Sequence, residues 1–188
     1  MERKKELYSS AIRSRVMIRE ALLELMKQKH IDKISVSEIM NKADLVRRTF
    51  YSHYKSKNDV ITMYVNELVT DAFKESLESS DECNETEGLE YFRIWDKNKE
   101  FVNILNDNDL LSLLNTYDSK VRHIKIRNEI LLSNGFSEKA VKYASTLYEG
   151  VVWSVLVHWI KTGMEESPEE LTRIMTEILS LSRNKSND

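Results

Sequence analysis

The residues best suited to recognition chemistry lie between positions 45 and 57, in the run LVRRTFYSHYKSK. These thirteen residues include two arginines, two lysines, three aromatic rings and one histidine, and they contain no carboxylate. An arginine can donate two hydrogen bonds to the edge of a guanine. Lysine, threonine, tyrosine and histidine side chains can donate hydrogen bonds to phosphates. The run therefore indicates contact with a polyanion, and with nucleic acid in particular.

The distribution of charge along the chain supports this interpretation. Residues 1–60 hold 14 Lys and Arg against 8 Asp and Glu, whereas residues 61–188 hold 14 against 23. The 188-residue chain nevertheless has a formal net charge of only -3. A basic N-terminal third joined to an acidic remainder indicates that the first part meets a polyanion, with chance clustering as the alternative.

Composition favours an all-α protein of the cytoplasm. Four glycines and one proline leave little of the turn chemistry that β-hairpins require. No run approaches the roughly 18 apolar residues of a membrane span, and the start MERKKELYSS lacks the apolar segment of a signal peptide. Cys83 is the single cysteine and cannot form an internal disulfide. We therefore expect a reducing, cytoplasmic setting and no membrane association.

Three helices are expected to position the cationic run. Over residues 12–29, apolar residues recur at the spacing of an amphipathic helix. Ser35 and Glu38 have the spacing of a capping box, which predicts the start of a short second helix. Residues 43–45 would then form a tight turn, and residues 46–54 a third helix.

A long helix, a short capped helix, a tight turn and another short helix form a helix-turn-helix unit, whose last helix enters the major groove of DNA. Phe50 and Tyr54 are four residues apart and are expected to pack inward on one face. The other faces would then carry donors to DNA, although a solvated arginine face and a partly buried histidine are the alternatives. The candidate DNA-binding residues are Ser35, Arg47, Arg48, Thr49, Tyr51, Ser52, His53, Lys55 and Lys57.

These residues resemble the N-terminal signature of the TetR-type (TetR/AcrR) transcriptional regulators. The signature appears here as SVSEI at residues 35–39, followed by a small turn and then TFYSHYKSK at residues 49–57. The resemblance covers the first third of the chain. It implies that Tyr51, His53 and Lys57 contact phosphates, and that the residues nearest the bases are Arg47, Arg48 and Thr49.

Three positions depart from the usual pattern of the family. Asp44 stands in place of a turn glycine, although aspartate tolerates a left-handed backbone better than most residues. Val46 stands where a serine-like cap usually starts the recognition helix, and we expect Asp44 to act as a substitute cap. Arg48 occupies a position where a small residue is common, so the resemblance does not predict the base preference.

The chain is expected to divide into a DNA-binding domain over residues 1–57 and a helical effector-binding and dimerisation domain over residues 58–188. A long helix over residues 58–79 would connect the two. An acidic, serine-rich loop is expected over residues 78–90. Further helical stretches follow, the longest of them over residues 110–132.

The last two expected helices carry a large apolar surface. Residues 141–160 are apolar on nearly all sides. The sequence SPEE from Ser167 predicts the start of a final helix with an apolar stripe. The family resemblance implies that such a pair forms a four-helix interface between two copies, and an intramolecular core is the alternative. The candidate interface residues are Leu147, Val151, Val155, Trp159, Leu171, Ile174, Met175 and Ile178.

The resemblance also implies a small-molecule pocket in the C-terminal domain. The aromatic residues of that domain would suit a small apolar or aromatic effector, although each such residue more often belongs to an ordinary core or interface. The candidate ligand-binding residues are Tyr91, Trp95, Tyr117, His123, Tyr148, Trp153 and His158.

An enzyme finds little support in the sequence. There is no glycine-rich phosphate loop and no HExxH motif, and the four histidines are dispersed without the spacing of metal ligands. We therefore expect no catalytic residues, no cofactor and no metal.

The prediction is a homodimeric regulator, with repression as its expected mode, that binds a near-palindromic operator in double-stranded DNA and is released by an effector. A helical adaptor that binds protein, or a co-activator without a small-molecule effector, is the alternative. It would explain the apolar C-terminal helices but not the cationic run.

Overall fold

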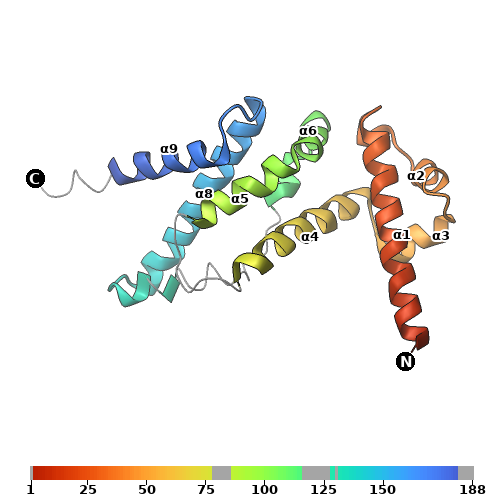
Figure 1. Ribbon diagram of the computed structural model, residues 1–188, viewed down its shortest axis with the longest axis horizontal. Helices are drawn as coiled ribbons and strands as arrows, with labels where there is room; N and C mark the ends of the chain where they lie inside the picture. Colours follow the sequence, from red (N-terminus) through yellow and green to blue (C-terminus); the bar gives the residue numbers. More distant parts are fainter. Residues whose placement is uncertain (1, 78–85, 116–127, 130, 182–188) are drawn as a thin grey trace, which may run out of the picture. The chain divides into compact units, whose positions relative to one another are not determined.

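The computed structural model describes residues 2–77, 86–115, 128–129 and 131–181. Within these ranges every regular element is helical, which confirms the expected all-α fold (Figure 1). The chain divides into two compact units: unit 1 comprises Met1–Leu68 and Glu100–Thr116, and unit 2 comprises Val69–Lys99 and Tyr117–Asp188. The domain boundary after residue 57 rested on the recognition motif alone, and it stays a prediction.

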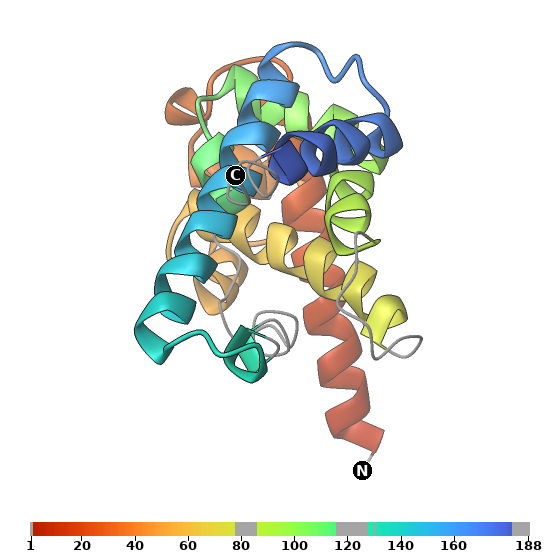
Figure 2. The same cartoon turned by 90° about the vertical axis from the view of Figure 1, so that its left-hand side faces the viewer.

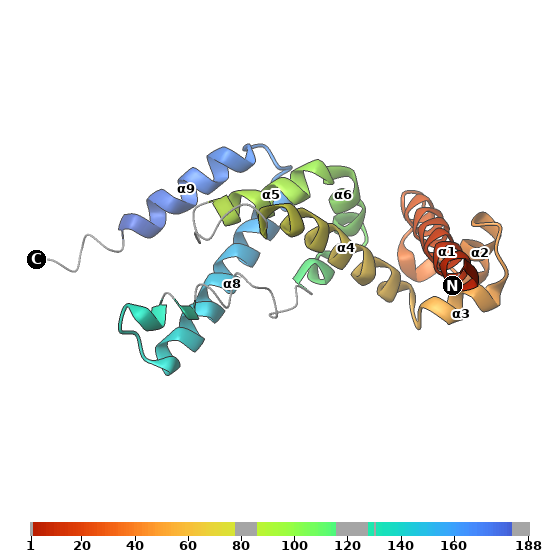
Figure 3. The ribbon, with the colours of Figure 1, turned by 60° about the horizontal axis from the view of Figure 1, so that its bottom comes forward.

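Unit 1 contains the expected helix-turn-helix elements. Its long first helix begins ten residues earlier than expected, because residues 2–11 contain neither glycine nor proline to stop it. Figure 3 shows α1 packed against α2 and α3, with α4 following directly after α3. The elements are α1 (Glu2–Met26), the 3₁₀ helix η1 (Ile31–Lys33), α2 (Val36–Lys42), α3 (Arg47–His53) and the first part of α4 (Lys57–Leu77).

A small apolar core holds these helices together. Its side chains without exposed surface include five that come from α1, α2, α3 and α4. Full burial of one such side chain contributes about 1.5–3 kcal/mol relative to exposure. The core therefore gives α3 a rigid support. The five side chains are Ile18, Leu22, Ile39, Phe50 and Ile61.

The turn between α2 and α3 takes a left-handed backbone at Asp44, with φ = +52°, which is the conformation that the family's glycine would supply. The Leu45 N–H donates to the Met40 carbonyl at 3.0 Å, and the Asp44 N–H to the Asn41 carbonyl at 3.3 Å. These two bonds form a Schellman motif at the end of α2. The expectation that Asp44 caps α3 is wrong, because it ends α2, and Val46 is the N-cap of α3 without a side-chain hydrogen bond.

The segment around α6 (Lys99–Asp107) and the 3₁₀ helix η2 (Leu111–Asn115) also belongs to unit 1. Asn108 follows α6, and its side chain is 2% exposed. Its Oδ1 accepts the Ile31 N–H at 2.7 Å, while its Nδ2 donates to the Ile104 carbonyl at 2.8 Å. This segment is therefore fixed to the turn that precedes α2.

The middle of the chain differs in part from the expected loop and helix. The loop expected over residues 78–90 is wrong in its second part, because α5 (Thr86–Lys97) already begins at Thr86, and its first part, residues 78–85, lies outside the described residues. Phe92 and Trp95 are 0% exposed and anchor this helix in the core of unit 2. The helix expected over residues 110–132 begins as η2, and its residues 116–127 and 130 lie outside the described residues.

Unit 2 contains the second part of α4, α5, α8 (Glu138–Lys161) and α9 (Pro168–Leu181). The Phe92 and Trp159 rings meet edge to face at 5.8 Å in its core. Figure 2 shows α9 alongside α5, where Arg93 donates to Glu169 at 2.7 and 3.0 Å. The predicted start of the last helix is confirmed, since the Ser167 hydroxyl accepts the Glu170 N–H at 3.1 Å. None of the described helices is long and apolar enough to cross a membrane.

Candidate nucleic-acid interface

The seven-residue helix α3 separates its side chains into an inner and an outer face. Phe50 is 0% exposed and Tyr54, just after the helix, is 5% exposed, which confirms that both pack inward. Arg47, Arg48 and Tyr51 lie on the outside. The helix thus presents two guanidinium groups and a phenol to any partner of this surface.

Arg47 and Tyr51 form a pair on the outer face. They stand four residues apart, and Arg47 Nη2 donates to Tyr51 Oη at 3.2 Å. The guanidinium carbon lies 5.6 Å from the centre of the Tyr51 ring. A side chain held this way loses less conformational freedom when it binds. The pair is therefore partly oriented before any partner arrives.

The remaining candidates near α3 differ in how free their donors are. The Ser52 hydroxyl donates to the Thr49 carbonyl at 2.7 Å, and Thr49 is half-buried. Lys55 is exposed. His53 is half-buried, and its pKa lies below its ordinary value because burial and then the positive charge of Arg15 disfavour protonation. At neutral pH His53 is thus mainly a neutral donor or acceptor.

Ser35 caps α2 in the way the sequence predicts. Its hydroxyl accepts the Glu38 N–H at 3.2 Å, and the Glu38 carboxylate accepts the Ser35 N–H at 2.9 Å. Lys29 adds a charged hydrogen bond to the same carboxylate. The Lys29 ammonium, followed by the Ser35 donors, lowers the pKa of Glu38 to about 2. This carboxylate holds the segment after α1 to the start of α2.

The low pKa of Glu38 leads to a testable pH dependence. A carboxyl group whose pKa is lower in the folded state stabilises the fold above its unfolded pKa, near 4.5, and this contribution is lost as the pH falls towards 2. We expect Glu38→Gln to lose less stability than the wild type between pH 5 and pH 3 in urea titrations. Glu20→Gln, an exposed change on α1, is the matched control. If the free energy of unfolding falls equally with pH in the wild type and in Glu38→Gln, the lowered pKa assigned to Glu38 is contradicted.

Lys57 begins α4, and its ammonium is turned towards η1. Lys57 Nζ donates to the Ile31 carbonyl at 2.5 Å and to the Ile34 carbonyl at 2.8 Å. The start of the helix is capped, since the Asp59 carboxylate accepts the Ser56 N–H at 3.0 Å. Lys57 therefore stabilises the turn before α2, and its contact with a phosphate stays a prediction.

Sequence reasoning missed three residues that shape this surface. Lys29 pairs with Glu38, Asn108 holds the Ile31 N–H, and Arg15 lies near His53. Each lies nine or more residues away from its partner, so no local pattern signals it. An asparagine in the run NDND reads as a turn residue, and only its burial shows its role.

The candidate effector residues fall into several environments. Tyr91 and Trp95 lie one turn apart on α5, with ring centres 5.9 Å apart. Burial raises the pKa of Tyr91 to about 12, partly opposed by the nearby Trp95 indole. The buried Trp95 Nε1, however, meets no acceptor in hydrogen-bonding geometry among the described residues. Tyr148 and Trp153 are half-buried and His158 is exposed on α8, whereas Tyr117 and His123 lie outside the described residues.

The candidate interface residues are also divided. Trp159 and Leu171 are buried inside unit 2, at 1% and 8% exposure. Leu147, Val151 and Ile178 are exposed, and these are large apolar side chains. The rest are half-buried, namely Val155, Ile174 and Met175. Their part in an interface stays a prediction, and the three exposed side chains are its best support.

Within the described part of the chain, no group of three or more His, Cys, Asp or Glu side chains is placed to hold a metal ion.

Comparison with known proteins gives matches at both ends of the chain. Residues 18–62 match the family described as "Bacterial regulatory proteins, tetR family". Residues 86–181, just over half of the chain, match the family described as "Transcriptional regulator C-terminal region". A stretch of 53 residues is 38% identical to YvdT of Bacillus subtilis (strain 168), an uncharacterized HTH-type transcriptional regulator. That stretch covers 28% of this chain and 27% of the length of YvdT.

The two family matches agree with the geometry described above. The N-terminal match includes the capped helix α2, the left-handed turn and the whole of α3. The C-terminal match includes α5, α6, α8 and α9. The chain belongs to the TetR family of bacterial transcriptional regulators, and its N-terminal helix-turn-helix is the DNA-binding domain of that family.

Proposed function

We propose that this regulator is a homodimeric repressor of the cytoplasm, which binds a near-palindromic operator and is released by a small effector. The observation that supports it best is the division of α3 into two faces. Phe50 is locked into the core, while Arg47, Arg48 and Tyr51 remain available for DNA. A short helix anchored in this way can enter the major groove without distortion of its own domain.

In the proposed complex Arg47, Arg48 and Thr49 lie nearest the bases. Each arginine can donate two hydrogen bonds to a guanine edge. Phosphate contacts on either side would hold α3 in register. Lys57 can take part as well, because an ammonium has three donors and two of them meet carbonyl groups. The proposed phosphate contacts are Ser35, Tyr51, Ser52, His53, Lys55 and Lys57.

The DNA-binding domains of two copies are proposed to act together, because one helix-turn-helix reads only a few base pairs. Paired domains read half-sites about 34–36 Å apart, or a multiple of that distance. The exposed apolar residues Leu147, Val151 and Ile178 on α8 and α9 offer a surface for pairing. Exposed apolar side chains of this size are typical of surfaces that meet another protein.

The effector is proposed to bind near Tyr91 and Trp95 and so to release the regulator from its operator. The buried Trp95 Nε1 meets no acceptor among the described residues, so an aromatic effector with a carbonyl or hydroxyl oxygen would satisfy it. The helix α4 runs from unit 1 into unit 2 and could transmit the change as a coupling between two sites. X-ray scattering of the operator-free dimer with and without a tightly bound effector tests this coupling. A distance between the two DNA-binding domains that does not change when the effector binds would contradict it.

The experiment that tests the proposed function most directly is selection of bound fragments from random DNA with the purified protein. We expect an enriched motif with two inverted half-sites, whose centres are separated by about one helical turn or a multiple of it. An enriched single half-site would contradict the dimeric mode. Failure to enrich any sequence would contradict the operator itself.

Changes on the outer face of α3 should alter affinity and specificity separately. We expect Arg47→Ala or Arg48→Ala to cost about 1–3 kcal/mol of binding free energy on the selected operator, and to relax the preference at one base position. Lys55→Ala should weaken binding to all sequences alike and reduce the salt slope by about one. Gel-shift titrations at several salt concentrations measure both quantities. Unchanged operator affinity in both arginine variants would refute the base contacts.

A protein adaptor or a co-activator without an effector is the second candidate function. The exposed side chains of Tyr143 and Leu147 on α8 favour it, because a protein partner could cover them. The two functions differ in their response to salt. Binding to DNA should fall steeply with added salt, whereas an adaptor would keep a salt-insensitive protein complex and would not retain DNA.

A further inference from the structure

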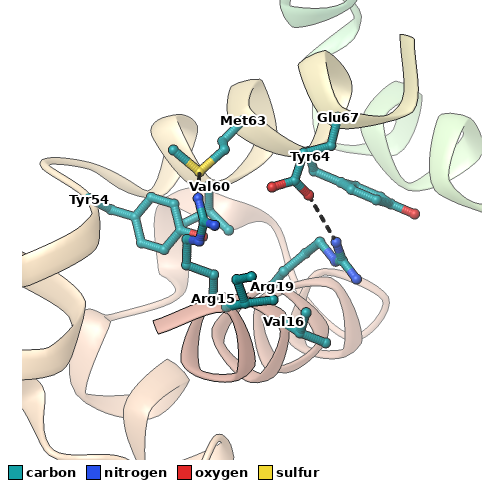
Figure 4. A pocket seen from close by; sticks show the side chains of 9 residues that line it. Arg15, Val16, Arg19, Tyr54, Val60, Met63, Tyr64 and Glu67 are labelled. Atoms are coloured by element: carbon teal, nitrogen blue, oxygen red, sulfur yellow. Dashed lines mark hydrogen bonds and ion pairs between the residues drawn. The ribbon is translucent and has the colours of Figure 1, made fainter. Parts of the chain in front are cut away.

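A cavity of about 220 Å³ lies between α1 and the first part of α4 in unit 1 (Figure 4). Arg15 and Arg19 enter it from α1, and Met63, Tyr64 and Glu67 enter it from α4. The cavity is smaller than the roughly 300–1,000 Å³ of pockets that hold drug-sized ligands. It is therefore suited to a small molecule.

The two arginines of this cavity are used in different ways. Arg19 donates to the Glu67 carboxylate at 3.4 Å and lies over the Tyr64 ring, 4.2 Å from its centre. Arg15 is half-buried, and its Nη1 lies 3.5 Å from the thioether sulfur of Met63. The structure gives Arg15 no carboxylate partner among the described residues. A thioether is a weak acceptor, so most of the guanidinium's five donors remain available.

The charges and the apolar walls together define the ligand. With Arg19 paired to Glu67, the cavity retains the one positive charge of Arg15. Figure 4 shows the Tyr54 ring beside the Arg15 guanidinium, with Met63 and Val60 close by. A half-buried cation is best satisfied by a charge-assisted bond to an anion.

We propose that the cavity binds a small organic monoanion. Its carboxylate would accept hydrogen bonds from the Arg15 guanidinium and the Tyr54 hydroxyl. Its apolar body would rest against Val60, Met63 and Tyr64. Inorganic phosphate would leave those walls without a partner, and a neutral molecule would leave Arg15 unpaired. The site lies within unit 1, which contains the helix-turn-helix, and is distinct from the proposed effector contacts of Tyr91 and Trp95.

Sodium benzoate is a suitable probe, because it joins one carboxylate to one apolar ring. With the full-length protein and no DNA, we expect saturable binding in calorimetry, with a Kd on the order of 1 mM for so small a ligand. Amide resonances of α1 and of the first part of α4 should shift. Benzamide, the neutral analogue, and inorganic phosphate should each bind at least about tenfold more weakly.

Two arginine variants locate the contact. Arg15→Gln should weaken benzoate binding by at least about tenfold. Arg13→Gln removes the same charge two residues away on the exposed side of α1, and it should leave benzoate binding unchanged. The pKa of His53, followed by NMR, provides an independent signal. Because Arg15 helps to lower the pKa of His53, neutralisation of Arg15 by benzoate should raise that pKa in the wild type.

Several results would overturn the proposal. One is the absence of saturable benzoate binding at about ten times the expected Kd. Equal effects of Arg13→Gln and Arg15→Gln, or amide shifts confined to unit 2, would place the ligand elsewhere. Benzamide or phosphate binding as tight as that of benzoate would refute the ligand class. A salt slope for DNA binding that falls by about one in Arg15→Gln would assign this arginine to the DNA backbone instead.

Discussion

Replacement of Phe50 by alanine should lower the free energy of unfolding of the DNA-binding unit by about 3–5 kcal/mol, the usual cost of removing a large ring from a core. Phe50 is 0% exposed. Its ring contacts those of Tyr51 and Tyr54, with centres 5.5 and 5.7 Å away. Loss of the ring removes the anchor of α3, so DNA binding should be lost together with stability.

Tyr51→Ala is the matched control for this prediction. Tyr51 is the next residue in the same helix and is 52% exposed. Its loss should change the free energy of unfolding by less than about 1 kcal/mol, as for most surface substitutions. It should still weaken binding to DNA, because a proposed phosphate donor is removed. Chemical denaturation and DNA titration of both variants separate the two effects, and equal destabilisation would refute the assigned faces.

Replacement of Asn108 by alanine should cost about 2–4 kcal/mol, since it leaves one buried N–H without an acceptor and removes two further hydrogen bonds, to the Ile104 and Met26 carbonyls. The buried N–H is that of Ile31, which donates to Asn108 Oδ1 at 2.7 Å. The Ile31 carbonyl is held at the same time by Lys57. Ile31 lies in the turn that leads to α2, so its release should also disturb the position from which α3 contacts DNA.

Asn103→Ala provides the control for Asn108→Ala. Asn103 lies on α6, the helix that Asn108 follows, and is exposed. We expect a change below about 0.5 kcal/mol for this surface position. Urea unfolding measures the difference in stability between the two variants. Hydrogen exchange at the Ile31 amide measures how well its N–H is held. Rapid exchange of that amide in Asn108→Ala alone would identify the lost bond, whereas similar exchange in both variants would contradict its role.

The sequence alone determined the parts of this protein that depend on near neighbours. The capping box of Ser35 and Glu38 and the cap of Asp59 at the start of α4 each involve residues three or four apart. The inward face of α3 follows from the four-residue spacing of Phe50 and Tyr54. Hydrogen bonds and periodicity at this range are encoded directly in residue types. For that reason the helix-turn-helix and its family were predictable.

Local patterns were less reliable at the ends of helices. An acidic, serine-rich composition is typical of a loop, and the loop was expected to extend to residue 90. The helix α5 nevertheless begins at Thr86. Asp44 was expected to cap the helix after it and instead ends the helix before it. Local propensity is a weak guide at such positions, because tertiary context can override it.

Only the tertiary structure decided which polar groups meet across the fold. Lys57 reaches a carbonyl 26 residues away, and Asn108 accepts from an amide 77 residues away. The same holds for Arg15, whose surroundings come from α1, α4 and the end of the recognition helix. Such contacts depend on how the helices pack, and helical spacing constrains only residues a few positions apart. The sequence therefore predicted a surface for DNA, while packing alone created the buried hydrogen bonds at Ile31 and the cationic cavity between α1 and α4.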